Sequence, residues 1–140
     1  MDACGKNRWG KHAASAVAYV EQEFGIVPDN PFSDFESMVM RHPASGKWFA
    51  LIMRVTADKL GLHERQQESI EIQNVKCEPA LLGSFRNKEG IHPAYHMNKD
   101  HWLTIRLDGS VSDADVCEMI GMSYNMTRPK GKKRGNTDDK

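Results

Sequence analysis

The sequence predicts a single two-layer α+β domain in which helices pack on one face of an antiparallel sheet. Three observations support this prediction. The chain has 140 residues, which is enough for one core of ordinary size. Several short stretches are rich in aromatic and β-branched residues, and other stretches have apolar residues at helical spacing. Turn-forming residues separate these stretches, and the predicted order of elements is αβββαβα.

The first predicted helix spans residues 13–24. Val17, Val20 and Phe24 place apolar side chains on one side of it, and Gly25 ends it.

Two further helices are predicted later in the chain. Pro79 favours the first position of a short helix over 79–85. Ser112 begins a capping-box-like pattern and therefore a helix that runs to about residue 124.

Four segments predict strands, and the last of them shows the cleanest alternation. There, Leu103 and Ile105 lie on one side, and Trp102, Thr104 and Arg106 lie on the other. Short turns favour an antiparallel hairpin between the first two strands. The polar connection between the second and third, residues 56–68, is expected to protrude like a wing. The predicted strands are 35–41, 47–55, 69–77 and 101–107.

The charge of the chain is balanced but unevenly distributed. Residues 1–11 carry +2 and residues 128–140 carry +4, so a net charge of 0 leaves −6 between them. Residues 13–127 are expected to form the folded domain, between a flexible arm (1–12) and a disordered basic tail (128–140). An acidic domain is poorly attracted to the phosphates of nucleic acid, so DNA binding would have to use a local basic patch or the tail.

The cysteines and the apolar segments of the sequence limit the class of protein. The three cysteines are Cys4, Cys77 and Cys117; their odd number and wide spacing argue against a disulfide framework and a zinc knuckle. No segment approaches the roughly 18 apolar residues of a membrane span, and the first residues lack a secretory core. We therefore expect a cytoplasmic protein with no membrane partner, no cofactor and no metal. The oligomeric state is not indicated.

A candidate binding face follows from strand alternation. In the second strand, alternation places Phe49, Leu51, Met53 and Val55 opposite Trp48, Ala50, Ile52 and Arg54. If helices cover the Phe49 side, an open face would carry Trp48, Arg54, Trp102 and Arg106, a set suited to stacking on bases or holding an acidic partner. The alternative is that each Trp packs at the edge of the core.

The segment 91–102 crowds three histidines, a tyrosine, an asparagine and a lysine before the last strand. The spacing of His92, His96 and His101 fits no familiar zinc pattern. An acid–base function would need a carboxylate such as Asp100 or Glu78 oriented on His96. The simplest interpretation is an ordered turn in which side chains bond the backbone.

Several of these segments together resemble the MmcQ/YjbR-like family over roughly residues 13–127. The matching motifs are His42-Pro43-x-Ser45-x-Lys47-Trp48-Phe49-Ala50-Leu51, Asn74-Val75-Lys76-Cys77-x-Pro79, Pro93-Ala94-Tyr95-His96-Met97-Asn98-Lys99-x-His101-Trp102, Leu107-Asp108-Gly109 and Ser123-Tyr124. The resemblance implies a CyaY-like α+β fold whose hairpins are compared with a double-wing DNA-binding arrangement. It implies no defined reaction and no catalytic residues, so the chain is not expected to be an enzyme.

Two functions remain open from the sequence. The first is DNA binding through a basic and aromatic surface aided by the basic tail. The second is a module for a protein or a small acidic ligand, with its pocket at the 93–102 loop. The candidate binding residues for either function are Lys47, Trp48, Lys76, Tyr95, His96, Asn98, Lys99, Trp102 and Arg106.

Overall fold

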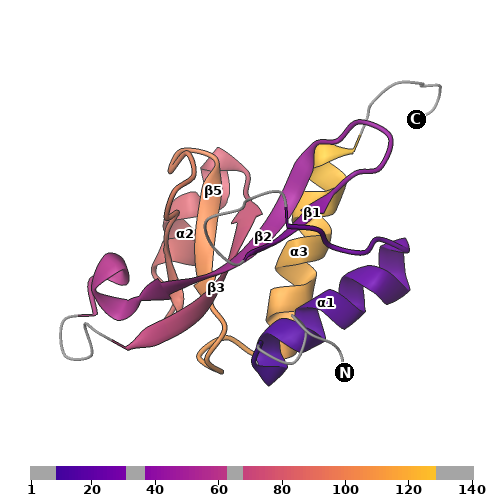
Figure 1. The fold of residues 1–140 in the computed structure, drawn as a ribbon. Coiled ribbons are helices and arrows are strands. Elements are labelled where there is room, and N and C mark those ends of the chain that lie inside the picture. Colours follow the sequence, from indigo (N-terminus) through magenta and orange to yellow (C-terminus); the bar gives the residue numbers. More distant parts are fainter. Residues whose placement is uncertain (1–8, 31–36, 63–67, 129–140) are drawn as a thin grey trace.

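The computed structural model describes residues 9–30, 37–62 and 68–128 and confirms the predicted α+β class. Five antiparallel strands form one sheet in the order β1-β2-β3-β5-β4 (Figure 1). The strands are β1 (Ser37–Arg41), β2 (Trp48–Thr56), β3 (Ser69–Lys76), β4 (Ile91–Pro93) and β5 (Trp102–Arg106). The helices are α1 (Lys11–Phe24), α2 (Leu82–Arg86) and α3 (Asp113–Thr127), with short 3-10 turns η2 (Ala57–Leu60) and η4 (Pro79–Leu81).

The edge strand β4 is a strand that the sequence did not predict. It pairs with β5 through Ile91 opposite Ile105 and Pro93 opposite Leu103. It has three residues, one of them a proline, so it has neither a visible alternation nor a full set of donors. Such a strand forms because β5 offers it an edge.

The helices cover one face of the sheet, as predicted. Phe49, Leu103 and Ile105 are fully buried in the core on this face. Phe24 of α1 stacks on Tyr124 of α3 with ring centroids 3.7 Å apart, and the Tyr124 ring also meets Phe49 edge-on at 5.0 Å. These aromatic contacts join both long helices to the sheet.

A bulge in β2 changes the predicted assignment of side chains to faces. Arg41 pairs with Trp48, but the next residue of β1, Met40, pairs with Ala50, so Phe49 is the extra residue. Past the bulge, the residues with odd numbers, from Leu51 onwards, lie on the face opposite the helices. The prediction that Leu51, Met53 and Val55 share the face of Phe49 was therefore wrong.

The second face is covered rather than open. Its apolar residues, including Val39, Leu51 and Ile72, form a second buried cluster. Tyr95 and Met97 from the loop after β4 pack on this cluster, as do Leu60 at the end of η2 and Leu62 just after it. The expected open binding face over the middle of the sheet is thus absent, and only its end stays accessible.

The folded part begins earlier than predicted. Trp9 packs against the helix-side core, and the backbone N–H of Gly10 donates to the Glu71 carboxylate at 3.0 Å. Residues 9–12, assigned to a flexible arm, therefore belong to the domain. The predicted tail after Arg128, the first residues of the arm and residues 63–67 of the predicted wing lie outside the described residues.

The ends of the helices follow the predicted chemistry. Gly25 caps α1 in the left-handed conformation at φ 67°, and the Ser112 hydroxyl accepts from the Asp115 N–H at 3.1 Å to cap α3. In the described ranges, no helix combines the length and the apolar character needed to cross a bilayer.

Candidate functional site

Four of the nine predicted site residues meet at one end of the sheet. Lys76 pairs with Trp102 across β3 and β5. The bulge turns Trp48 to the face on which the second cluster lies, and Lys47 immediately precedes it in the β1–β2 turn. Trp48, Lys76 and Trp102 are all partly exposed, and Lys47 is exposed. Lys76 on β3 thus lies between β2, which carries Trp48, and β5, which carries Trp102.

Ser123 of α3 fixes this end of the sheet. Its hydroxyl donates to the Phe49 carbonyl at 2.6 Å and accepts from the Lys76 N–H at 2.9 Å. Phe49 and Lys76 lie one residue past the last β2–β3 pair, Ala50 opposite Val75, and backbone groups shielded from water must be satisfied somewhere. Ser123 therefore links the bulge in β2 to the last residue of β3.

The same end of the molecule carries a hollow that we call the basic hollow. It has a volume of about 600 Å³ and is lined by Ser45, Gly46, Lys47, Lys76, Met126, Thr127 and Arg128. Figure 1 shows the β1–β2 turn beside the C-terminal end of α3, and Lys76 at the end of β3 completes the lining. Lys47, Lys76 and Arg128 contribute three cations. Arg128 was assigned to the tail by the sequence, so its part in a site was missed.

His42 lies behind the basic hollow. Its Nε2 is 2.8 Å from the Thr127 hydroxyl, and that hydroxyl donates to the Ser123 carbonyl at 2.8 Å. Burial lowers the pKa of His42 below its ordinary value, and the positive charges of Arg128 and Lys47 lower it further, against a hydrogen bond with the Tyr124 backbone. The imidazole is therefore neutral at pH 7 and serves as a structural support, not as a further cation.

The 94–101 loop forms a cover over the sheet. Asn74 donates from Nδ2 to the Tyr95 carbonyl at 3.1 Å, and the Tyr95 N–H donates to the Thr104 hydroxyl at 2.8 Å. Asn74 and Thr104 are fully buried and also bond each other. This network presses Tyr95 against the sheet, as the turn interpretation of the sequence expected.

The remaining loop candidates are exposed and serve the turn itself. His96 adopts φ 66° and its ring lies 4.2 Å from that of Tyr95. Asn98 accepts from the Asp100 N–H at 2.8 Å, and its carbonyl accepts from the Trp102 N–H at 2.9 Å. The Lys99 carbonyl accepts from the Arg86 guanidinium. This loop does not line the basic hollow.

Arg106 does not lie on an accessible surface. Its side chain is only 9% exposed, and its guanidinium lies 3.7 Å from Asp108 and 4.0 Å from Glu89. Arg54, expected beside Trp48, instead points to the helix face, where it lies 3.3 Å from Glu71 and 4.2 Å from the Trp9 ring centroid. Neither arginine can meet a partner together with the two tryptophans, which corrects the predicted face.

The groups available for chemistry are poorly activated. Burial raises the pKa of the Cys77 thiol, as does the Glu78 carboxylate, and burial raises that of Cys117 in the same way. Both thiols therefore stay protonated and are weak nucleophiles at pH 7. Among the residues that the structure describes, no three His, Cys, Asp or Glu side chains gather in a way that could hold a metal ion.

These features define a small α+β domain with a basic hollow at the end of its sheet. A family model described as YjbR matches residues 24–126, so the chain belongs to the YjbR family. The family assignment agrees with the resemblance seen in the motifs.

Similar proteins extend over most of the chain. An uncharacterised protein of Bacillus subtilis, YyaQ, is 35% identical over 111 residues, covering 79% of this chain and 92% of that protein. Uncharacterised YjbR of Escherichia coli K12 is 31% identical over 78 residues, covering 55% of this chain and 65% of its own. A crystal structure of a Pseudomonas syringae protein has a TM-score of 0.78 and 34% identity, covering 86% of this chain and 100% of its own. A Deinococcus radiodurans protein, 23% identical with a TM-score of 0.62 over 84% of this chain and 78% of its own, shares the fold.

Proposed function

We propose that this domain binds DNA, with the basic hollow as its contact to the phosphate backbone. The observation that carries the proposal is the meeting of Lys47, Lys76 and Arg128 from three segments around one hollow. Phosphate contacts by Lys and Arg supply most of the affinity in sequence-independent binding. Binding at this end keeps DNA away from the acidic remainder of the body.

Two further features support DNA binding at the same end of the molecule. The sequence that follows Arg128 carries five more cations, namely Lys130, Lys132, Lys133, Arg134 and Lys140, against two aspartates. Trp102 pairs with Lys76 and is partly exposed, so an aromatic ring lies beside a phosphate-binding cation. This combination suits contact with sugars or unpaired bases.

The test is a fluorescence-anisotropy titration of a mixed-sequence duplex with the full chain at several salt concentrations. Replacing Lys47, Lys76 and Arg128 by alanine should weaken binding and reduce the steepness of the salt dependence. Each phosphate contact contributes about 0.9 to the slope of log affinity against log salt, so three lost contacts should remove about 2.7. A Lys59→Ala variant is the matched control, because Lys59 is exposed in η2 at the far end of β2.

A second full-length variant separates the hollow from the tail. Neutralising Lys130, Lys132, Lys133 and Arg134 with glutamine leaves the hollow unchanged. If this variant loses all affinity while the triple alanine variant retains it, the hollow makes no contact and the proposal is wrong. Equal binding by the parent chain at low and high salt would contradict the mechanism as well.

The alternative function, a module for a small acidic ligand or an acidic protein, is favoured by the concave shape of the same hollow. The 93–102 loop, where the sequence expected the pocket, is occupied in covering the sheet through Tyr95 and Met97. Competition distinguishes the two functions. If inorganic pyrophosphate displaces the duplex only at concentrations where simple salt does so, DNA is the better partner; if it displaces the duplex at much lower concentrations, the hollow prefers a small anion.

A further inference from the structure

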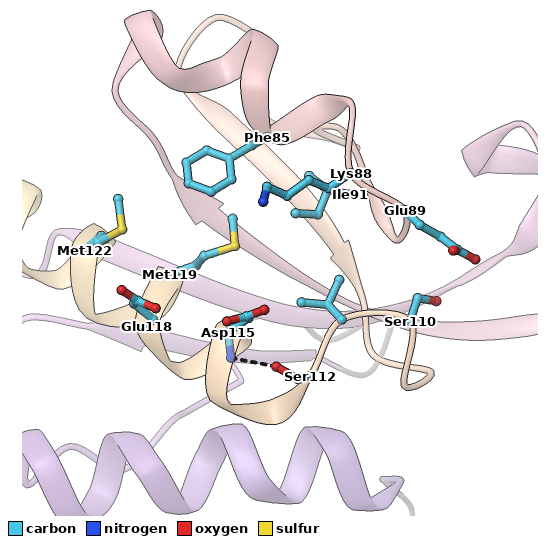
Figure 2. A pocket seen from close by; sticks show the side chains of 11 residues that line it. Phe85, Lys88, Glu89, Ile91, Ser110, Ser112, Asp115, Glu118, Met119 and Met122 are labelled. Atoms are coloured by element: carbon cyan, nitrogen blue, oxygen red, sulfur yellow. Dashed lines mark hydrogen bonds between the residues drawn. The ribbon is translucent and has the colours of Figure 1, made fainter.

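A second hollow lies at the opposite end of α3, and it has the reverse chemistry. It has a volume of about 380 Å³ and lies between the segment from α2 to β4 and α3, along α3 as far as Met122 (Figure 2). We call it the carboxylate hollow. Its lining residues are Phe85, Lys88, Glu89, Ile91, Ser110, Val111, Ser112, Asp115, Glu118, Met119 and Met122.

The floor of the carboxylate hollow is apolar. Phe85 faces Met119 and Met122 across the opening, and the buried residues Ile91 and Val111 also line the hollow. Its volume falls within the range of small-molecule sites, which are mostly apolar with a few convergent polar groups. Methionine side chains adapt to ligands of different shape, so two of them in one wall suit a binding surface.

The charged groups around this floor favour a cation. Asp115 and Glu118 on α3 and Glu89 on the facing segment give three carboxylates against one lysine, Lys88. Within the described ranges, no Lys or Arg nitrogen lies within 4 Å of the Asp115 or Glu118 carboxylate. These two carboxylates are exposed at the rim and available to an incoming charge.

Lys88 indicates where that charge would lie. Figure 2 shows its ammonium group directed into the space between Phe85 and α3, on the side of the carboxylates. Lys88 is exposed and belongs to the segment after α2, so its side chain can turn outward at little cost. The chain thus places a displaceable cation of its own over the apolar floor.

We propose that the carboxylate hollow binds a small organic cation, namely an ammonium group carried on an aromatic or alkyl body. The body lies on Phe85, Met119 and Met122, where the Phe85 ring also attracts positive charge through its face. The ammonium group takes the place of the Lys88 ammonium in the space between Phe85 and α3 and approaches the Asp115 and Glu118 carboxylates. This site is separate from the basic hollow, so its occupant is independent of DNA.

The test uses 2-phenylethylammonium as the probe, with the full chain carrying ¹³C-labelled methionine methyl groups. A titration followed by NMR should shift the Met119 and Met122 signals, and should leave that of Met126 at the basic hollow unchanged. Phenylacetate and 2-phenylethanol keep the aromatic body while changing or removing the charge. They should bind at least several-fold more weakly. Equal affinity for all three compounds would overturn the proposal.

Variants distinguish charge recognition from simple apolar binding. Asp115→Asn combined with Glu118→Gln should raise the Kd for the amine about fivefold or more, whereas Glu23→Gln, at an exposed position of α1, should leave it unchanged. Lys88→Ala should lower the Kd, because the ligand no longer displaces an internal cation. An unchanged Kd in the folded Asp115/Glu118 variant, or a higher Kd in Lys88→Ala, would show that no ammonium site exists here.

Discussion

The Ser123 hydroxyl connects three parts of the molecule through two hydrogen bonds. It holds the Phe49 carbonyl in the bulge and the Lys76 amide at the end of β3, while its own helix leads to Arg128. Of these residues, Lys76 and Arg128 line the basic hollow. The small buried side chain of Ser123 therefore positions Lys76 and Arg128, two of the three cations of the basic hollow.

Replacing Ser123 by alanine should lower the free energy of unfolding by about 2–4 kcal/mol. The substitution leaves the buried Phe49 carbonyl and the partly buried Lys76 N–H unsatisfied, at about 1–3 kcal/mol each, with partial relaxation. Urea denaturation measures the change, and Ser84→Ala, at an exposed position of α2, is the control, expected to change the stability by no more than about 0.5 kcal/mol. If the two variants unfold at the same urea concentration, the bulge does not depend on Ser123.

At the scale of elements, α1 is attached to the sheet by a clamp at its first turn. The Glu71 carboxylate of β3 accepts from the Gly10 N–H at 3.0 Å and lies 3.3 Å from the Arg54 guanidinium, which covers the Trp9 ring. The clamp satisfies a donor at the start of a helix whose cap residue is glycine and has no side-chain acceptor.

Removing the clamp should loosen α1 before the rest of the fold. We expect Glu71→Ala to lose about 1–3 kcal/mol of stability and to speed amide hydrogen exchange in the first turns of α1. Exchange in α3 should change less, because its own cap at Ser112 is intact. Glu23→Ala serves as the control on the exposed side of α1, and identical exchange in both variants would mean that Glu71 does not hold the helix.

For the whole molecule, the buried His42 and the partly buried His92 make stability depend on pH. Burial lowers the pKa of His42 and of His92 below the ordinary value of 6.5, and Arg106 lowers that of His92 further against an opposing effect of Asp108. The unfolded chain therefore binds protons first as the pH falls. The contribution of these two histidines to the free energy of unfolding should decrease below about pH 6.5. It should level off once the imidazoles of the folded protein are protonated.

Chemical denaturation at pH 7.5 and at pH 5.5 tests this dependence. The difference between the two pH values should be smaller in a His42→Gln, His92→Gln double variant than in the parent chain. The carboxylates titrate equally in both proteins, so the comparison isolates the imidazoles. A pH dependence that is the same in both would show that neither histidine is held neutral by the fold.

The sequence by itself determined the class of fold and most of its elements. The clean alternation of residues 101–107 and the capping pattern at Ser112 gave β5 and the start of α3, because local periodicity and cap chemistry need no distant partner. It also singled out Lys47, Trp48, Lys76 and Trp102, which the structure gathers at one end of the sheet.

Only the tertiary structure decided which faces these residues share and what lies open. The bulge at Phe49 is fixed by Ser123, 74 residues away, so strand periodicity alone reversed the faces of β2 and misplaced Arg54. Arg128 joins the basic hollow because α3 ends beside the β1–β2 turn, a neighbourhood that no local pattern encodes. Side-chain direction within a strand follows from the backbone, but surfaces made by several segments follow from packing.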